Sequence, residues 1–386
     1  MTLKQILKTL YAPHKAFKEI IQNPKYLGPL LIMVMLVIAN VAFTYAATSK
    51  TYVEHSIPTG EKLDEWTENR TLWTSTPNAT ISENNDSITG GYFGNASIAF
   101  SVTNATQVWT ELDNIGPVNC SSPDEYTRLS FRAKWTSPQT QPTNMTIKLF
   151  SNYSSDYFSY NPAVDSLSLT YNTWNNLTIP VNTADWSSSN PNTNWEKITS
   201  LRLELTWNEN TNITLLVDGL FFHGPFSSLF ENAGSLYLVN YAILGFMQFI
   251  VTWVVLSGLA YILTKTFGGK LVWKPLLILI GFALITMFAQ ALVNAIAYAA
   301  LPNMRYPFEL LVGVKGEAQT VVDSINSQTW VVAYIQRFMQ IAVWIWTIAL
   351  TTLAVRLLAA ISWFKSAAIA AIAYFVTLIV ESFIVG

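Results

Sequence analysis

The chain has 386 residues, of which 51% are hydrophobic and only 12% charged, whereas roughly 25% are charged in an ordinary soluble protein. The net charge is −2 and the basic residues form no stripe, so no nucleic-acid partner is expected. The single cysteine excludes a disulfide framework, and three histidines far apart in the sequence argue against a zinc site or a histidine-based triad. This composition favours a membrane protein.

Five apolar stretches are each long enough to cross about 30 Å of hydrocarbon as a helix. They cover residues 27–47, 236–263, 275–301, 330–354 and 366–385. Lysines and arginines gather before the first stretch, between the second and third, and between the fourth and fifth. The positive-inside rule therefore predicts a multi-pass protein of the cell membrane with a cytoplasmic N-terminus and an extracellular C-terminus, in contact with membrane lipid.

Residues 1–26 predict a basic amphipathic segment on the cytoplasmic side, because Leu3, Ile6, Leu7 and Leu10 recur at helical spacing beside lysines. The stretch 27–47 is longer than the apolar core of a secretory signal, so an uncleaved span fits better than a cleaved leader. Residues 232–386 hold the remaining four spans. We expect the membrane part to be an α-helical bundle of five transmembrane helices.

Between the first two spans, residues 48–231 change to a sequence rich in Asn, Ser, Thr, Trp and Tyr. Apolar residues alternate with polar ones along several short runs, such as Leu201, Leu203 and Leu205, as in half-buried strands. Turn-forming clusters separate the runs, so we expect an inserted extracellular all-β sandwich of about eight strands or more.

This segment contains ten Asn-x-Ser/Thr sequons, and no other part of the chain contains any. Such sequons are acceptors for N-glycosylation when they are exposed. The candidate glycosylation sites are Asn69, Asn78, Asn85, Asn95, Asn104, Asn119, Asn144, Asn152, Asn176 and Asn212.

The order of the spans and their glycine and proline positions resemble the Yip family, which is named for interaction with Ypt/Rab GTPases. The similar segments are LYAPHKAFKEIIQNPKYLGPLL near the N-terminus, GLAYILTKTFGGKLVWKPLLILIGFA between the second and third spans, and SWFKSAAIAAIAYFV at the last span. The long cytoplasmic tail of eukaryotic members is missing and the insertion is an addition. Rab binding is therefore not carried over to this chain.

The insertion is similar to the jelly-roll sandwiches of carbohydrate-binding modules, through LDEW (63–66), GYFGNASIAF (91–100), NWEKITSLRLELTW (194–207) and ITLLVDGLFFHG (213–224). In such domains the aspartate of the last strand often helps to hold a structural calcium ion. The resemblance therefore nominates Asp218, with Glu61, as calcium ligands, and oxygen ligands of this kind suit calcium.

Few polar groups interrupt the spans, and the calculated depths of four of them coincide: Asn40, Asn294, Arg337 and Glu381. An intramembrane charge is costly unless it is paired, so we expect an Arg337–Glu381 pair within this polar layer. The layer serves either as hydrogen-bonded packing between helices or as the lining of a transport pathway.

Aromatic side chains in polar, loop-like sequence could stack on sugar rings, although packing in the core is the alternative for each. These residues are Trp174, Trp186, Tyr153, Tyr157 and Tyr160.

No catalytic residues are nominated, because the nucleophile, phosphate-loop and zinc-protease motifs are missing. The leading hypothesis is a non-enzymatic cell-surface protein whose sandwich contacts glycan, surface-layer protein or a membrane partner. Its rival is a small transporter or channel built around Arg337.

Overall fold

The computed structural model describes residues 2–59, 64–88, 94–121, 125–151, 154–312 and 318–384, and the elements below refer to these segments. The chain divides into two compact units. The first comprises Met1–Tyr52, Ser228–Met304 and Ser324–Gly386, and the second comprises Val53–Ser227 and Arg305–Asp323.

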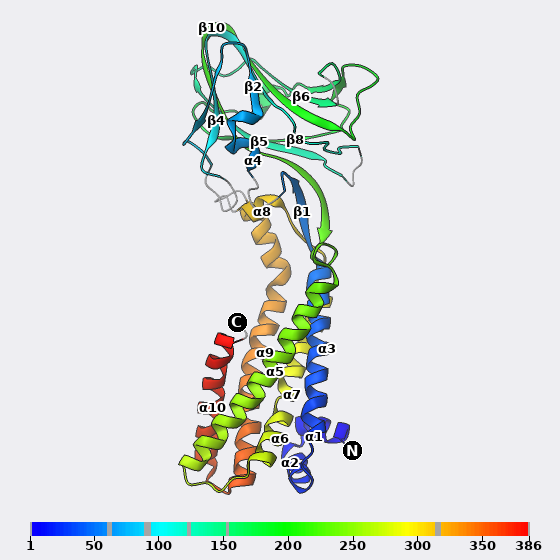
Figure 1. Cartoon of the computed structure of the whole chain (residues 1–386), viewed down its shortest axis with the longest axis vertical. Helices are drawn as coiled ribbons and strands as arrows, with labels where there is room; N and C mark the ends of the chain where they lie inside the picture. The colour runs from blue at the N-terminus through cyan, green and yellow to red at the C-terminus, as the bar shows by residue number, and fades with distance from the viewer. Residues whose placement is uncertain are drawn as a thin grey trace. The chain divides into compact units, whose positions relative to one another are not determined.

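The first unit is helical (Figure 1). Its helices are α1 (Thr2–Tyr11), α2 (Pro13–Gln22), α3 (Leu27–Lys50), α5 (Leu229–Thr266), α6 (Trp273–Ala283), α7 (Ile285–Ala299), α9 (Gln319–Ala359), whose first turn belongs to the second unit, and α10 (Trp363–Ile384). Five segments are long and apolar enough to cross a membrane: Leu27–Lys50, Gly234–Thr266, Trp273–Ala299, Gln319–Ala359 and Trp363–Ile384. The five predicted transmembrane helices are therefore confirmed. The third is interrupted at Leu284, between α6 and α7.

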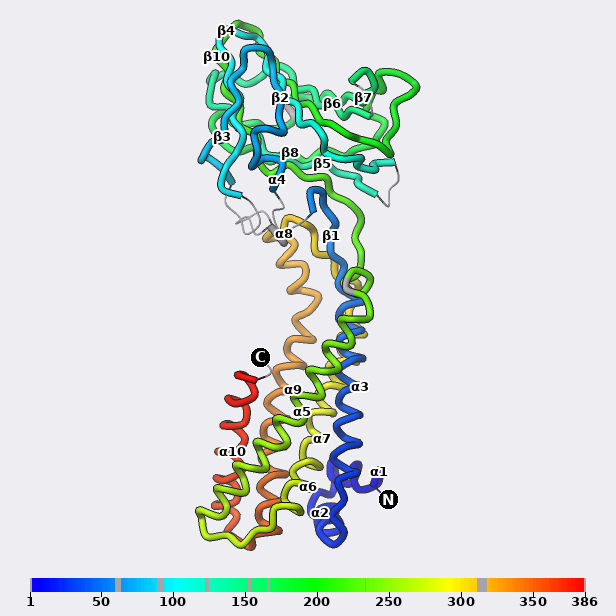
Figure 2. The backbone as a smooth tube through the Cα atoms, viewed as in Figure 1, coloured from blue at the N-terminus to red at the C-terminus, as the bar shows by residue number. Residues whose placement is uncertain are grey.

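Helix α3 packs against α5, α6 and α7 in the helical bundle (Figure 2). The N-terminal basic segment forms two helices rather than one. Some of their apolar side chains are buried in the bundle and others are exposed. Ile6 and Phe17 are fully buried in the core of this unit, whereas Leu3 and Leu7 are more than half exposed. The segment is therefore partly a packing element of the bundle, and Leu3 and Leu7 are available to lipid.

Gly28 in α3 lies against the ring of Phe282 in α6. A Cβ atom at Gly28 would lie only 2.0 Å from Phe282 Cζ, and Phe282 is itself 1% exposed, so the ring has little room to move. We expect Gly28→Ala to destabilise the protein by about 1–3 kcal/mol through overpacking. Thermal unfolding in detergent would measure it. Gly258→Ala is the matched control, because no atom lies within 4 Å of its added Cβ; an equal loss in both variants would contradict the packing argument.

The second unit is built on antiparallel strands that form an 11-stranded sheet. The strands are β1 (Thr51–Ile57), β2 (Trp73–Ser75), β3 (Thr80–Asn84), β4 (Ser97–Leu112), β5 (Arg128–Ser137), β6 (Asn144–Ser151), β7 (Tyr157–Tyr160), β8 (Asn175–Pro180), β9 (Ser187–Ser188), β10 (Ile198–Ser228) and β11 (Met304–Tyr306). Short helical turns are α4 (Glu65–Glu68), η1 (Arg70–Leu72), η2 (Val164–Leu167) and α8 (Phe308–Val312).

The 31-residue strand β10 belongs to both layers of a sandwich. Its first half, Ile198–Thr206, pairs with β6, and its second half, Thr214–His223, pairs with β5, while β4 follows it through both halves. The two halves face each other across one core that contains Trp135, Phe100 and Leu203. The β-sandwich predicted from alternation is therefore confirmed.

The boundaries of this unit differ from the expected 48–231. Helix α3 continues to Lys50 and α5 begins at Leu229, so the insertion proper is shorter at both ends. The predicted spans leave residues 302–329 as a loop between the third and the fourth, but residues 305–323 belong to the sandwich unit. Phe308 explains this placement, because it is 3% exposed and its ring packs 4.6 Å from the ring of Phe221.

Candidate functional sites

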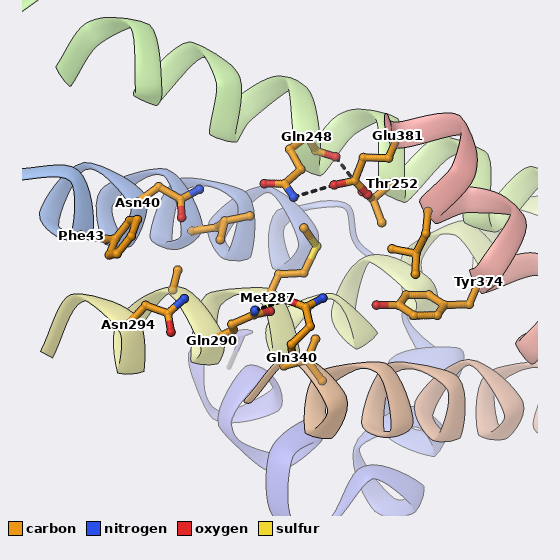
Figure 3. Close-up of a pocket in the computed structure, with 14 residues that line it drawn as sticks. Asn40, Phe43, Gln248, Thr252, Met287, Gln290, Asn294, Gln340, Tyr374 and Glu381 are labelled. Carbon is orange, nitrogen blue, oxygen red and sulfur yellow. Dashed lines mark hydrogen bonds between the residues drawn. The ribbon is translucent and has the colours of Figure 1, made fainter. Parts of the chain in front are cut away.

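A polar cavity of about 230 Å³ lies inside the helical unit (Figure 3). Its polar lining comes from five helices: Asn40, Gln248, Thr252, Gln290, Asn294, Gln340, Tyr374 and Glu381. A second cavity of about 440 Å³ shares Asn40, Phe43, Gln248, Leu378 and Glu381 with the first. Glu381 therefore borders a continuous polar region among the spans.

The carboxylate of Glu381 accepts hydrogen bonds from α5. Gln248 Nε2 donates to Oε1 at 2.5 Å and Thr252 Oγ1 donates to Oε2 at 2.9 Å, as the dashed lines in Figure 3 show. Across the cavity, Gln290 Nε2 donates to Gln340 Oε1 at 2.6 Å. Asn294 Oδ1 is buried and has no hydrogen-bond partner among the described residues. The cavity thus offers one carboxylate and one unused amide oxygen.

The expected polar layer forms only in part, because Arg337 is not a member of it. Arg337 is exposed and lines a different cavity with Trp330 and Tyr334, and within the described part of the chain it forms no ion pair with Glu381. Helix α9 begins at Gln319 instead of the expected 330. Three residues after Arg337 on this helix, Gln340 lines the polar cavity and bonds to Gln290, while Arg337 lines the other cavity.

Local backbone features allow the cavity to form. At Gly245 in α5, an added Cβ would lie 2.6 Å from Asn40 Nδ2, so glycine lets the Asn40 amide reach this helix. The interruption at Leu284 leaves the carbonyl of Ala283 to accept from Thr286 Oγ1 at 3.2 Å, and Thr286 also bonds to Thr347 Oγ1 at 2.7 Å. A hydroxyl pair thus stabilises the broken third span against α9.

A second candidate site is the outward surface of the sandwich half formed by β2, β4, β10, β6, β7 and β9, which we call the ladder face. Strand register places one row of polar side chains directly side by side across it: Thr74, Glu111, Arg202, Lys148, Ser159 and Ser187. Their neighbours along each strand point into the core. Register therefore produces the row, because side chains alternate between the two faces of a sheet.

Arg202 lies at the centre of the ladder face. Its guanidinium lies 4.4 Å from the ring centre of Trp109 and 5.2 Å from that of Phe150. It bonds to Glu111, with an Nε–Oε2 distance of 2.5 Å, and approaches Glu204 to 3.6 Å. The pKa of Glu111 is raised, chiefly by burial and against the opposing effect of Arg202.

Lys148 continues the ladder face towards β7. It bonds to Glu204 at 2.8 Å and lies 5.3 Å from the ring centre of Tyr157. The charges of Glu111 and Glu204 thus balance those of Arg202 and Lys148. These side chains lie beside the half-buried rings of Trp109 and Tyr157. Both basic neighbours of Glu204, Arg202 and Lys148, hold it in ion pairs.

The expected aromatic platform is not one surface. Trp186 is 8% exposed and its ring stacks on Tyr160 at 5.3 Å and meets Trp195 edge-on at 5.5 Å, so it is a core residue. Trp174 lies elsewhere, where its Nε1 donates to Asp86 Oδ1 at 3.1 Å. Tyr157 alone contributes to the ladder face, and Tyr153 lies outside the described residues. Trp109 and Arg202 escaped sequence analysis because neither lies in a loop-like segment.

The nominated calcium ligand Asp218 is fully buried, and its neighbour in space is Asp64, which is 2% exposed. Asp218 accepts from the Ile88 and Gly219 amides at 2.6 and 2.7 Å, and Thr67 Oγ1 donates to Asp64 and, at 3.3 Å, to Asp218. Burial and the charge of Asp218 raise the pKa of Asp64 to about 8. Two buried carboxylates and a hydroxyl fit a hard cation such as calcium. Glu61, the other nominated ligand, lies outside the described residues.

The sequon asparagines lie mostly at the surface of the sandwich unit. Of those described, Asn119 is half-buried and the others are exposed: Asn69, Asn78, Asn85, Asn95, Asn104, Asn144, Asn176 and Asn212. Asn152 lies outside the described residues. Surface exposure is the condition that a glycosyltransferase requires.

Comparison with protein families places residues 190–384 in the Yip1 domain family, and the match covers half of the chain. The chain therefore belongs to the Yip1 domain family of multi-pass membrane proteins. No curated protein matches it.

Solved structures similar to the chain include carbohydrate-binding modules. A family 11 module from Clostridium thermocellum, solved in complex with a β-1,3-1,4-mixed-linked tetrasaccharide, is 15% identical, with 41% of this chain and 92% of that chain covered and a TM-score of 0.27. A family 30 module of a cellulosomal cellulase of the same organism is 13% identical, with 46% and 91% covered and a TM-score of 0.28.

Proposed function

We propose that this protein is a non-enzymatic, membrane-anchored glycan-binding protein that binds saccharide on the ladder face. The observation that supports this proposal is the row of hydrogen-bonding side chains centred on Arg202 and lying beside the rings of Trp109 and Tyr157. Aromatic rings provide apolar faces for the C–H surface of a sugar ring, and charged side chains form strong hydrogen bonds to hydroxyl groups.

The charge of the ladder face favours a neutral partner. Glu111 and Glu204 are each paired with Arg202, and Lys148 is paired with Glu204. Because these charges balance locally, a highly charged ligand would gain little from the face, whereas a neutral saccharide can use its donors and acceptors. A surface-layer protein would present such saccharides only if it is glycosylated, and a membrane protein partner would need a different surface.

Loss of saccharide binding should follow from Arg202→Ala and from Trp109→Ala. Residues of these two types at the centre of an interface typically contribute about 2 kcal/mol or more, so we expect affinity to fall at least about tenfold. Binding would be measured on a glycan array and then by calorimetry with the best oligosaccharide.

Trp174→Ala is the matched control, because Trp174 is half-buried on another part of the sandwich. It should leave affinity unchanged. Equal losses at Trp174 and Trp109, or no saccharide bound by the unmodified protein, would contradict the ladder face as the binding site.

We further propose that the sandwich unit is extracellular, carries N-glycans at its exposed sequons and binds a structural calcium ion through Asp64 and Asp218. The lysine and arginine distribution among the span-linking segments supports this orientation. A reporter fused after Gly386 should then be extracellular.

Treatment of the native protein with peptide N-glycosidase should increase its electrophoretic mobility, and an unchanged mobility would contradict glycosylation.

A second candidate function is passage of a small cation through the helical unit, and two observations favour it. Polar cavities reach Glu381 among the spans, and the third span is broken at Leu284. Broken helices and intramembrane carboxylates are typical of transport pathways. Flux of protons or potassium ions into proteoliposomes, measured for the unmodified protein and for Glu381→Gln, would test it. Absence of flux above that of empty liposomes would contradict it.

A further inference from the structure

A cluster of ligating side chains lies within the sandwich unit at a place that neither the ladder face nor the Asp64–Asp218 pair uses. It brings together Glu54 of β1, His223 of β10 and Glu309 of α8. One ligand atom of each residue lies within 4.8 Å of the others. Glu54 and His223 are 4% and 1% exposed, whereas Glu309 is partly exposed and leaves access from solvent.

The imidazole of His223 is oriented as a ligand would be. Its Nε2 lies 2.6 Å from Ser130 Oγ, and its Nδ1 is buried and has no hydrogen-bond partner among the described residues. When Ser130 accepts from Nε2–H, Nδ1 carries a lone pair that points at two carboxylates. A cation between them removes that repulsion, and a hydrogen bond to the far ring nitrogen is the usual support of a metal-bound histidine.

One distance in the cluster agrees with the spacing of two ligands on a bound metal ion. His223 Nδ1 and Glu54 Oε2 are 3.5 Å apart, which is long for a charged hydrogen bond, whose usual length is about 2.7–2.9 Å. Two ligands bound tetrahedrally to zinc with bonds of about 2.0–2.1 Å are separated by about 3.3–3.4 Å. The observed spacing is therefore close to the edge of a zinc tetrahedron.

Hydrogen bonds from neighbouring residues position the Glu54 carboxylate and still leave it able to bind a metal ion. Arg128 bonds to Glu54 Oε1, and the Phe308 amide donates to Oε2 at 2.9 Å, so the carboxylate is held in place while Oε2 keeps a second lone pair. Arg128 also approaches Glu309 to 3.9 Å.

We propose that Glu54, His223 and Glu309 bind a divalent transition-metal ion, and the ligand set points to zinc. One imidazole and two carboxylates are ligands that zinc accepts, and a water molecule would complete the tetrahedron. The ion would join the segment 305–323 to β1 and β10 of the same unit. Sequence analysis discounted zinc because the three histidines are far apart, but the ligands come from three segments that only the fold brings together.

Zinc binding to the full-length protein in detergent would test the proposal. The protein is stripped with chelator and titrated with zinc chloride in the presence of excess calcium, which occupies sites made of oxygen ligands alone. We expect one equivalent of zinc bound, and an affinity lowered by more than about 100-fold in Glu309→Gln, because loss of a ligand exceeds the 10–100-fold effect of its outer partners.

Glu196→Gln is the matched control, since Glu196 is an exposed acid of the same unit, and it should bind zinc as the unmodified protein does. Cobalt(II) substituted for zinc should give the strong visible absorption of a tetrahedral site, and Glu309→Gln should lose it. No zinc bound by the unmodified protein, or equal affinity in Glu309→Gln and Glu196→Gln, would overturn the proposal and leave the cluster as a set of contacts between protein side chains.

Discussion

In chelator, the thermal stability of the protein should fall as the pH rises from about 4 to about 8, and calcium should restore it. The pKa of Asp64 is raised from 3.8 to about 8 in the folded state, first by burial and then by the charge of Asp218. Between these two values the folded state keeps a proton that the unfolded state has released. The free energy of unfolding therefore decreases with rising pH, by on the order of 1 kcal/mol per pH unit for one such group.

Calcium should reduce this fall in stability at high pH, because the ion replaces the proton between Asp64 and Asp218 as the compensating positive charge. A ligand that binds only the folded state stabilises it, so the melting temperature at pH 8 should rise on addition of calcium and depend less on pH. Asp64→Asn removes the titrating group and should flatten the pH dependence in chelator.

Exposed Asp185 provides the control variant Asp185→Asn, which should keep the full pH dependence. Differential scanning calorimetry of the three proteins from pH 4 to pH 8, with and without calcium, would measure these effects. If Asp64→Asn and the unmodified protein have the same slope in chelator, the two aspartates do not share a proton, and buried Arg132, opposite Asp218 in the β5–β10 register, becomes the alternative counter-charge.

The transmembrane helices could be predicted from sequence because a span needs only a continuous apolar run. Their ends could not be predicted so well. Residues 319–329 are polar, yet α9 begins at Gln319, because a helix continues through polar sequence wherever its backbone hydrogen bonds are satisfied. Depth calculated from sequence also did not show that Gln340, rather than Arg337, lines the polar cavity.

The sandwich strands could likewise be predicted, because a half-buried strand alternates apolar and polar residues. The residues that polar side chains contact in the folded sandwich could not be predicted from the sequence. Glu61 and Asp218 were paired by resemblance, whereas Asp64 is the carboxylate that lies beside Asp218 in the structure. Arg202 and Trp109 occupy neighbouring strands far apart in the sequence, and pairing of such strands depends on register that a single sequence does not reveal.

The segment 305–323 shows the same limit. It lies between two predicted spans and carries charges of both signs, and nothing in its sequence marks Phe308 as a residue that is buried in the sandwich unit. Tertiary contacts join it to the sandwich unit, among them the packing of Phe308 on Phe221 and the bond from the Phe308 amide to Glu54. The proposed zinc ligand Glu309 enters with it.

Removing the hydrogen-bond donors of Glu381 should be strongly destabilising, and removing Arg337 should not. Gln248 and Thr252 donate to the two oxygens of this carboxylate, so Gln248→Leu with Thr252→Val removes both of these donors from a carboxylate that lies among the spans. We expect a loss of about 2–4 kcal/mol, by analogy with the cost of an unpaired charge in a buried or membrane setting. Adding Glu381→Leu to this pair should recover part of the loss.

Thermal unfolding in lipid nanodiscs would give the coupling energy from a double-mutant cycle between the two donors and Glu381. The cycle between Arg337→Met and Glu381→Leu is the matched control, and its effects should add, because Arg337 is exposed and lines another cavity. Strong coupling in the second cycle, with additive effects in the first, would show that Glu381 pairs with Arg337 in the membrane. The carboxylate would then be neutralised by an arginine rather than available to a cation, and the transport candidate would lose its only intramembrane acid among the described residues.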